Sequence, residues 1–102
     1  MKATTKKQPK RELSEIARLL KVAGEPSRIE ILCVIFREQK ICVSDIASEL
    51  HMSVAIVSHH LQVMAGEGLL EPYREGKCTF YAFADKGFAG DLKTLICKYK
   101  NN

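Results

Sequence analysis

The sequence predicts a mainly α-helical domain that carries one small β-hairpin. In four segments before Gly66 and one well after it, apolar residues recur at the i, i+3 and i+4 spacing of amphipathic helices. After Gly68 the pattern changes to two short apolar runs on either side of a glycine, which is typical of a hairpin. A chain of 102 residues is long enough for one such domain with a single modest core.

The first two predicted helices are separated by Gly24, a residue that commonly ends a helix. The apolar positions of the first helix are Leu13, Ile16, Ala17, Leu20 and Ala23. Pro26 suits the first turn of the second helix, because its missing N–H would have no partner there. The apolar stripe of the second helix is predicted to be Ile29, Leu32, Cys33 and Phe36.

The next two predicted helices are short and almost contiguous. Val43, Ile46, Ala47 and Leu50 repeat at helical spacing, as do Val57, Leu61 and Met64 in a segment from about residue 54 to residue 65. Only "HMS" separates them, and Ser53 is placed to cap the second. Such a tight junction makes two helices cross steeply, as in a helix-turn-helix, whose second helix can enter a DNA major groove.

A hairpin and a final helix follow this pair. "LLEPYR" and "CTFYAF" are predicted strands around "EGK", with Gly76 in the turn and Pro72 restricting the first strand to an edge position. A last amphipathic helix is marked by Phe88, Leu92, Leu95, Ile96 and Tyr99. The predicted order is therefore α-α-α-α-β-β-α, and a helix-turn-helix followed by a hairpin is a winged helix-turn-helix.

The net charge of +4 is concentrated at the start of the chain. Residues 1–11 hold five of the 16 basic residues and no acidic residue, which leaves 11 basic against 12 acidic residues in the remainder. We expect residues 1–11 to form a basic disordered arm and residues 12–102 to form the folded domain. The arm is either a solvated tail or a segment that steers the protein toward nucleic-acid phosphates.

The sequence also predicts a cytoplasmic protein without a membrane partner. No apolar run approaches the roughly 20 residues that cross a bilayer, and the basic start is not followed by the apolar region of a secretory signal. Thiols in the cytoplasm are kept reduced, so we expect no structural disulfide among the four cysteines.

The segment "LLKVAGEPSRIEIL…SDIASELHMSVAIVSHHLQVMAGEGLLEPYREGKCTFYAF" resembles the ArsR/SmtB group of bacterial winged-helix repressors, most specifically in "SHHL", "GEGLLE" and "REGK…FY". The resemblance implies a homodimer that pairs through its first and last helices and binds an inverted-repeat operator in double-stranded DNA. Residues 12–102 would then be a DNA-binding and dimerisation domain, and an inducer would release it from the operator.

The residues expected to meet DNA lie on the outward side of the fourth helix and in the hairpin. Because Val57, Leu61 and Met64 face inward on a helical wheel, their neighbours face solvent. Val54 and Ala55 stand where many relatives carry a Gln-Ser pair, and they can touch a thymine methyl group but cannot hydrogen-bond a base. The predicted DNA-binding set is Ser53, Val54, Ala55, Ser58, His59, Gln62, Arg74 and Lys77.

This assignment leaves other interpretations open. A solvated polar face is the alternative for Ser58 and His59. Residues 53–66 contain no Lys or Arg, so phosphate contacts must come from the hairpin, from the arm, or from Arg28 or Lys40. His60 lies nearer the buried side and is expected to be structural.

Metal sensing and other cofactors are not expected from the cysteines and histidines. One metal site of the family uses a Cys-Val-Cys run at the start of the third helix, which here reads Cys42-Val43-Ser44, and a hydroxyl replaces a thiolate poorly toward soft metals. Residues 1–15 contain no Cys or His, and the last helix contains no histidine to form the family's other known site.

Another branch of the family senses oxidants or reactive sulfur through one cysteine in the second helix and one near the end of the last. Cys33 and Cys97 match these placements. The resemblance thus implies that oxidation or persulfidation of a Cys33/Cys97 dithiol releases the repressor from its operator. Core filling is the alternative for Cys33, because free cysteine is often buried.

The remaining cysteines are harder to assign. Cys42 stands near the start of the third helix, where a thiol is acidified, so it is a possible reactive thiol or partner of Cys33. Cys78 has no thiol partner apparent from the sequence and is interpreted as structural.

The leading function is therefore a dimeric repressor. The alternatives within that class are a metal-responsive repressor that uses Cys42 and a repressor with no inducer of its own. A thiol enzyme is not expected, because no Cys/His arrangement supplies a nucleophile with a base. A winged helix that binds a protein instead of DNA is the third class.

Overall fold

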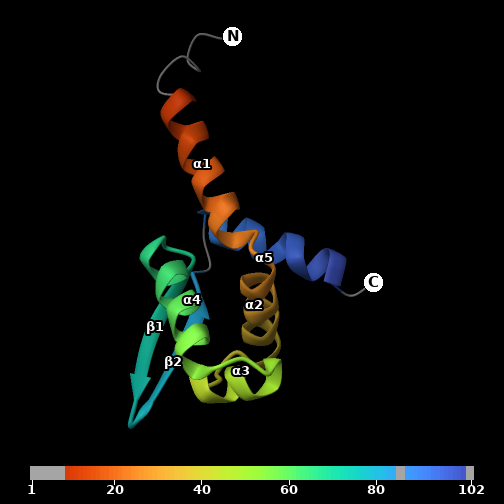
Figure 1. Ribbon diagram of the computed structural model, residues 1–102. Coiled ribbons are helices and arrows are strands. Elements are labelled where there is room, and N and C mark those ends of the chain that lie inside the picture. Colours follow the sequence, from red (N-terminus) through yellow and green to blue (C-terminus); the bar gives the residue numbers. More distant parts are fainter. Residues whose placement is uncertain (1–8, 85–86, 101–102) are drawn as a thin grey trace.

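The computed structural model describes residues 9–84 and 87–100 and has the predicted element order (Figure 1). Its elements are α1 (Pro9–Ala23), α2 (Pro26–Glu38), α3 (Val43–Leu50), α4 (Val54–Gly66), β1 (Leu70–Glu75), β2 (Cys78–Phe83) and α5 (Gly87–Lys100). The winged helix-turn-helix prediction is thereby confirmed. Because α1 begins at Pro9, the helix includes residues 9–11 of the predicted arm. The rest of the predicted arm, residues 1–8, lies outside the described residues.

The core forms around α2, which contacts α3, α4 and β2. Its most deeply buried residues are Ile31, Leu32, Val34 and Ile35. The predicted stripe was therefore only partly right, since Ile29, Cys33 and Phe36 are half-buried and pack against the edge of the core. A single stripe was expected because one covered face was assumed, whereas α2 is covered on several sides.

The junction between α3 and α4 reverses the chain within the predicted residues. His51 adopts a left-handed conformation with φ of 57°, and the Met52 N–H donates to the Ala47 carbonyl oxygen at 2.9 Å. The Ser53 hydroxyl then accepts a hydrogen bond from the Ile56 N–H at 3.0 Å, which confirms the predicted helix cap. The inward set of α4 is confirmed as well, because Val57, Leu61 and Met64 are each 0% exposed.

The two strands form an antiparallel hairpin that extends away from the helices as a wing (Figure 1). The register pairs Leu70 with Phe83 at one end and Glu75 with Cys78 at the other, beside the turn. Gly76 has a φ of 62°, a conformation that side-chain-bearing residues rarely adopt. A further antiparallel bridge joins Cys42, just before α3, to Phe80 of β2.

The first and last helices leave apolar side chains uncovered. α1 points away from the rest of the molecule (Figure 1), and Leu13, Ile16 and Leu20 are exposed along it. In α5, Ala89, Leu92 and Ile96 are buried, whereas Leu95 and Tyr99 are 49% and 64% exposed. Only part of the predicted apolar face of α5 is therefore buried within one chain. No helix in the described residues has the length and apolar character needed to traverse a bilayer.

Candidate nucleic-acid interface and thiol pairs

The outward side of α4 is formed by polar and small residues. Packing of Val57, Leu61 and Met64 into the core directs the opposite side of the helix to solvent. Ser53, Val54, Ala55, His59 and Gln62 are exposed there, and Ser58 is half-buried. The Gln62 amide nitrogen donates to the Ser58 hydroxyl at 3.2 Å, so these two side chains lie together one helical turn apart.

A hollow of about 560 Å³ lies between α4, the start of α3 and the outer half of β2. From the predicted DNA-binding set, Val54, Ser58, Gln62 and Lys77 line it. Arg74 and Lys77 are both exposed, and Arg74 pairs with Thr79 in the hairpin register. The fold thus places Lys77 of the wing beside the outward side of α4, a helix that contains no Lys or Arg.

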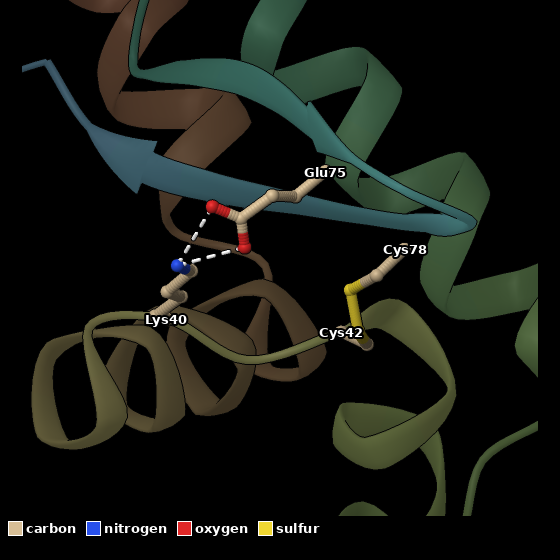
Figure 2. The surroundings of a disulfide bond; sticks show 4 residues. All are labelled: Lys40, Cys42, Glu75 and Cys78. Atoms are coloured by element: carbon tan, nitrogen blue, oxygen red, sulfur yellow. Dashed lines mark hydrogen bonds and ion pairs between the residues drawn. A yellow bond between two sulfur atoms is a disulfide. The ribbon is translucent and has the colours of Figure 1, made fainter.

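Two other candidate phosphate contacts are engaged within the protein. Lys40 Nζ lies 2.8 Å from a Glu75 carboxylate oxygen (Figure 2). The same nitrogen lies 5.3 Å from the centre of the Phe80 ring. Arg28 Nη1 donates to the Val22 carbonyl oxygen at 3.1 Å, and its Nε donates to His60. Neither side chain is therefore as available for phosphate as those of Arg74 and Lys77.

The structural assignment of His60 is confirmed by its contact with α2. His60 Nδ1 accepts the hydrogen bond from Arg28 Nε at 3.0 Å, which requires an unprotonated imidazole. Burial lowers the pKa of His60 below its ordinary value of 6.5; Glu25 acts in the opposite direction, and Arg28 and His59 lower the pKa further. This contact joins α2 to the recognition helix of the helix-turn-helix.

Cys42 and Cys78 form a disulfide, contrary to the sequence-based expectation (Figure 2). Their Cα atoms are 5.7 Å apart, within the roughly 4.4–6.8 Å that a disulfide requires, although 36 residues separate them in the chain. The prediction that the chain has no structural disulfide was therefore wrong, and Cys78 has a thiol partner that was not apparent from the sequence. The physical reason is the bridge between Cys42 and Phe80, which brings the start of α3 beside β2.

The predicted position of Cys42 is confirmed, since it is the N-cap residue of α3 and its side chain makes no capping hydrogen bond. The sequence left open a pairing of Cys42 with Cys33, but in the structure Cys42 is paired with Cys78. In the sequence, the only signal at Cys78 is its position in the alternating pattern of the hairpin strand. That signal does not identify Cys78 as the partner of Cys42 unless it is known that the segment before α3 pairs with β2.

Cys33 and Cys97 are the free thiols, and both are half-buried. Cys33 borders an apolar pocket of about 400 Å³ whose other walls are Ile29, Leu95, Ile96, Tyr99 and Lys100. Burial raises the pKa of the Cys33 thiol; Lys100 lowers it, while Cys97 and Glu30 raise it further. Cys33 thus lies where α2 meets α5, and Cys97, which raises its pKa, lies on α5.

The described residues contain no preformed metal site. Across residues 9–84 and 87–100, no group of three or more His, Cys, Asp or Glu side chains is placed to hold an ion. Cys42, the one cysteine retained from the family's Cys-Val-Cys run, has its sulfur in the disulfide and supplies no thiolate in this state.

The fold and the exposed side of α4 define a winged helix-turn-helix protein of the kind that regulates transcription. Residues 25–71 match the model described as "Bacterial regulatory protein, arsR family". The chain belongs to this family.

Named relatives agree with that membership. A cadmium resistance transcriptional regulatory protein CadC homolog of Staphylococcus aureus is 31% identical over 72 residues, which cover 71% of this chain and 60% of the relative. The HTH-type transcriptional regulator CmtR of Mycobacterium bovis is 32% identical over 84 residues, covering 81% and 70%. The chain thus spans about 60% of the length of the CadC homolog. These names are those of regulators, which agrees with the prediction that the chain is not an enzyme.

A solved structure extends the likeness to almost the whole chain. The homodimeric winged helix-turn-helix DNA-binding domain Mb0332 of Mycobacterium bovis, a possible ArsR-family transcriptional regulator, superposes with a TM-score of 0.76 at 26% identity. The superposition covers 98% of this chain and 87% of that one.

The contact between Arg28 and His60 predicts a pH dependence of stability. The folded state lowers the pKa of His60 and so favours the neutral imidazole. The stabilisation that the neutral imidazole contributes to the fold is therefore present above the ordinary pKa of 6.5 and is lost as the pH falls below that value. The free energy of unfolding should fall less between about pH 7.5 and pH 5.5 in His60→Gln than in the parent protein.

Chemical denaturation at one fixed protein concentration measures this difference. His51→Asn, which removes the exposed histidine of the α3–α4 junction, is the matched control and should retain the parent's pH dependence. Identical pH dependence in His60→Gln and the parent would contradict the assignment.

Proposed function

We propose that the chain is a dimeric bacterial transcriptional repressor. It binds an inverted-repeat operator through α4 and the wing, and oxidation or persulfidation of Cys33 and Cys97 releases it. It acts in the cytoplasm, where its operator lies. The observation that carries the proposal is the outward side of α4: its inward residues are 0% exposed, so its polar side is held rigidly toward solvent beside a basic wing.

The contacts expected with DNA divide into two kinds. Ser58, His59 and Gln62 have hydrogen-bonding groups that reach base edges or phosphates from a helix in the major groove, and Val54 and Ala55 present methyl groups to thymine. Arg74 and Lys77 supply positive charge that attracts the DNA phosphates, and this attraction weakens as the salt concentration rises. Ser53 adds a hydroxyl at the helix start, although that oxygen already accepts from the Ile56 N–H.

Self-association is supported by the apolar residues left uncovered on α1 and α5. Leu13, Ile16 and Leu20 are exposed on one helix, and Leu95 and Tyr99 on the other. Exposed apolar residues gathered on two helices mark a protein interface more often than a free surface. A two-fold dimer through these helices presents two copies of α4, which matches an inverted repeat. The similar Mb0332 domain is described as homodimeric.

The inducer response is supported by the position of the free thiols. Cys33 on α2 borders a pocket that residues of α5, the proposed dimer helix, also line, and Cys97 lies on α5. A peroxide would convert the two thiols to a disulfide, with the two electrons passing to the peroxide, which is reduced to an alcohol and water. A polysulfide would instead transfer one sulfur atom to one thiolate, giving a persulfide and a polysulfide shorter by one sulfur; the second thiolate would then attack the cysteine sulfur of that persulfide, form a disulfide and release hydrosulfide. Either link fixes α5 against α2 and so changes the spacing of the two recognition helices.

Loss of the wing's charge should weaken operator binding in a salt-dependent way. In the double variant Arg74→Gln/Lys77→Gln, the slope of log affinity against log salt concentration should fall in magnitude by up to about 2, because at most two phosphate contacts are lost. Fluorescence anisotropy with a duplex selected by the full chain from a random-sequence pool measures the slope. Lys21→Gln, which removes one positive charge from an exposed position of α1, is the control and should leave the slope unchanged. An unchanged slope in the double variant would remove the wing from the interface.

Substitution of either free thiol should abolish the response to inducer. Polysulfide or peroxide should weaken operator binding by the parent protein. Cys33→Ser and Cys97→Ser should each bind DNA and no longer lose affinity on oxidation, because neither retains a partner for the remaining sulfur. The control is Cys42→Ser/Cys78→Ser, in which the loss of affinity should persist and a reductant should reverse it.

The same anisotropy assay decides between the alternatives. A full response in both single variants would contradict the dithiol assignment. Tight binding of zinc, cadmium or arsenite to the reduced protein would favour the metal-responsive repressor instead.

A further inference from the structure

The disulfide between Cys42 and Cys78 joins the two structural parts that the proposed operator contact uses. Cys42 is the N-cap residue of α3, which positions α4. Cys78 is the first residue of β2 and pairs with Glu75, the last pair before the turn at Gly76. The bond therefore ties the outer end of the wing to the helix-turn-helix (Figure 2).

The bond is open to small reactants. Both cysteines are half-buried rather than sealed, and both line the hollow of about 560 Å³ that also contains Ser58, Gln62 and Lys77. A small thiol or disulfide can therefore reach the sulfur atoms from the side that faces the proposed DNA.

The other contacts that hold the outer wing are weaker. The ion pair between Lys40 and Glu75 is between side chains that are 59% and 64% exposed, and such pairs contribute little to stability. The backbone bridge from Cys42 reaches Phe80, which lies farther from the turn than Cys78. The covalent bond is thus the main constraint on the segment that carries Arg74 and Lys77.

We propose that Cys42 and Cys78 form a reversible thiol–disulfide site, separate from Cys33 and Cys97, which exchanges with low-molecular-weight disulfides and whose oxidised state strengthens operator binding. Its consequence for DNA rests on the proposed repressor function, but the exchange and the constraint on the wing do not.

The exchange proceeds in two balanced steps. The Cys42 thiolate attacks a disulfide R–S–S–R, which gives a mixed disulfide and releases RS⁻. The Cys78 thiolate then attacks the Cys42 sulfur and releases the second RS⁻, so the protein loses two electrons and two protons and the small disulfide is reduced to two thiols. The N-terminus of α3 favours a thiolate at Cys42, although Asp45 in the first turn opposes it. Cys42 is therefore the attacking sulfur and Cys78 the resolving one.

The direction of the effect follows from pre-organisation. A wing that is already fixed loses less conformational freedom when it binds phosphates, so the oxidised protein binds more tightly. The disulfide form leaves Arg74 and Lys77 exposed, which is compatible with this role. Reduction should weaken operator binding by about five- to tenfold, the lower end of the usual range of coupling between two sites. The sign is opposite to that expected for oxidation of Cys33 and Cys97.

The test uses the full chain with Cys33→Ser and Cys97→Ser, so that only Cys42 and Cys78 react. The protein is reduced with dithiothreitol or oxidised with hydroxyethyl disulfide, and mass spectrometry after alkylation reports the bond. Amide hydrogen exchange of residues 74–79 reports the constraint on the wing, and anisotropy with the selected duplex reports affinity. The matched control carries Cys42→Ser and Cys78→Ser in the same background and should respond to neither reagent.

The expected result is a bond that forms and breaks reversibly, faster exchange at residues 74–79 on reduction, and a five- to tenfold loss of affinity. Failure of the bond to form, unchanged hydrogen exchange, or affinity that is unchanged or higher after reduction overturns the proposal. Absence of DNA binding in every state, together with redox-dependent exchange in the wing, overturns the repressor function and the effect on DNA while the thiol site and its constraint stand.

Discussion

The arrangement of the whole molecule depends on the burial of one side of α4. Val57, Leu61 and Met64 are fully buried and fix the rotation of the helix about its own axis, so the opposite side, with His59 and Gln62, is exposed. The Ser53 cap fixes where the helix begins, and the contact from Arg28 to His60 ties it to α2. The outward side of α4 is therefore rigid, and a rigid helix is what recognition of a groove requires.

The two cysteine pairs lie in different places relative to this rigid unit. Cys33 borders the apolar pocket that Leu95 and Tyr99 of α5 also line, and Cys97 lies on α5, so under the proposed function a link between these two thiols would change how two copies are spaced. Cys42 and Cys78 lie where α3 meets the wing, so their bond constrains the wing within a single copy of the chain. Under the two proposals, the effects of the two pairs on operator binding would be separable by substitution.

Much of the fold could be predicted from the sequence because its determinants are local. The spacing of Val57, Leu61 and Met64 and the position of Ser53 each depend on one helix. The disulfide could not be predicted, because the proximity of Cys42 and Cys78 depends on a bridge between residues 42 and 80. The pattern of α5 likewise indicates an apolar face but not whether the same chain covers Leu95 and Tyr99. The DNA contacts of α4 and the wing stay predictions, since exposure shows which residues are available and not what they bind.

The most direct test of the account is an NMR titration of the ¹⁵N-labelled full chain with the selected operator duplex. If the outward side of α4 and the wing meet DNA, the amide resonances of residues 53–62 and 74–79 should shift most, and those of residues 88–100 should shift least. Shifts concentrated on α5, or an unperturbed spectrum at DNA concentrations that saturate binding, would contradict it.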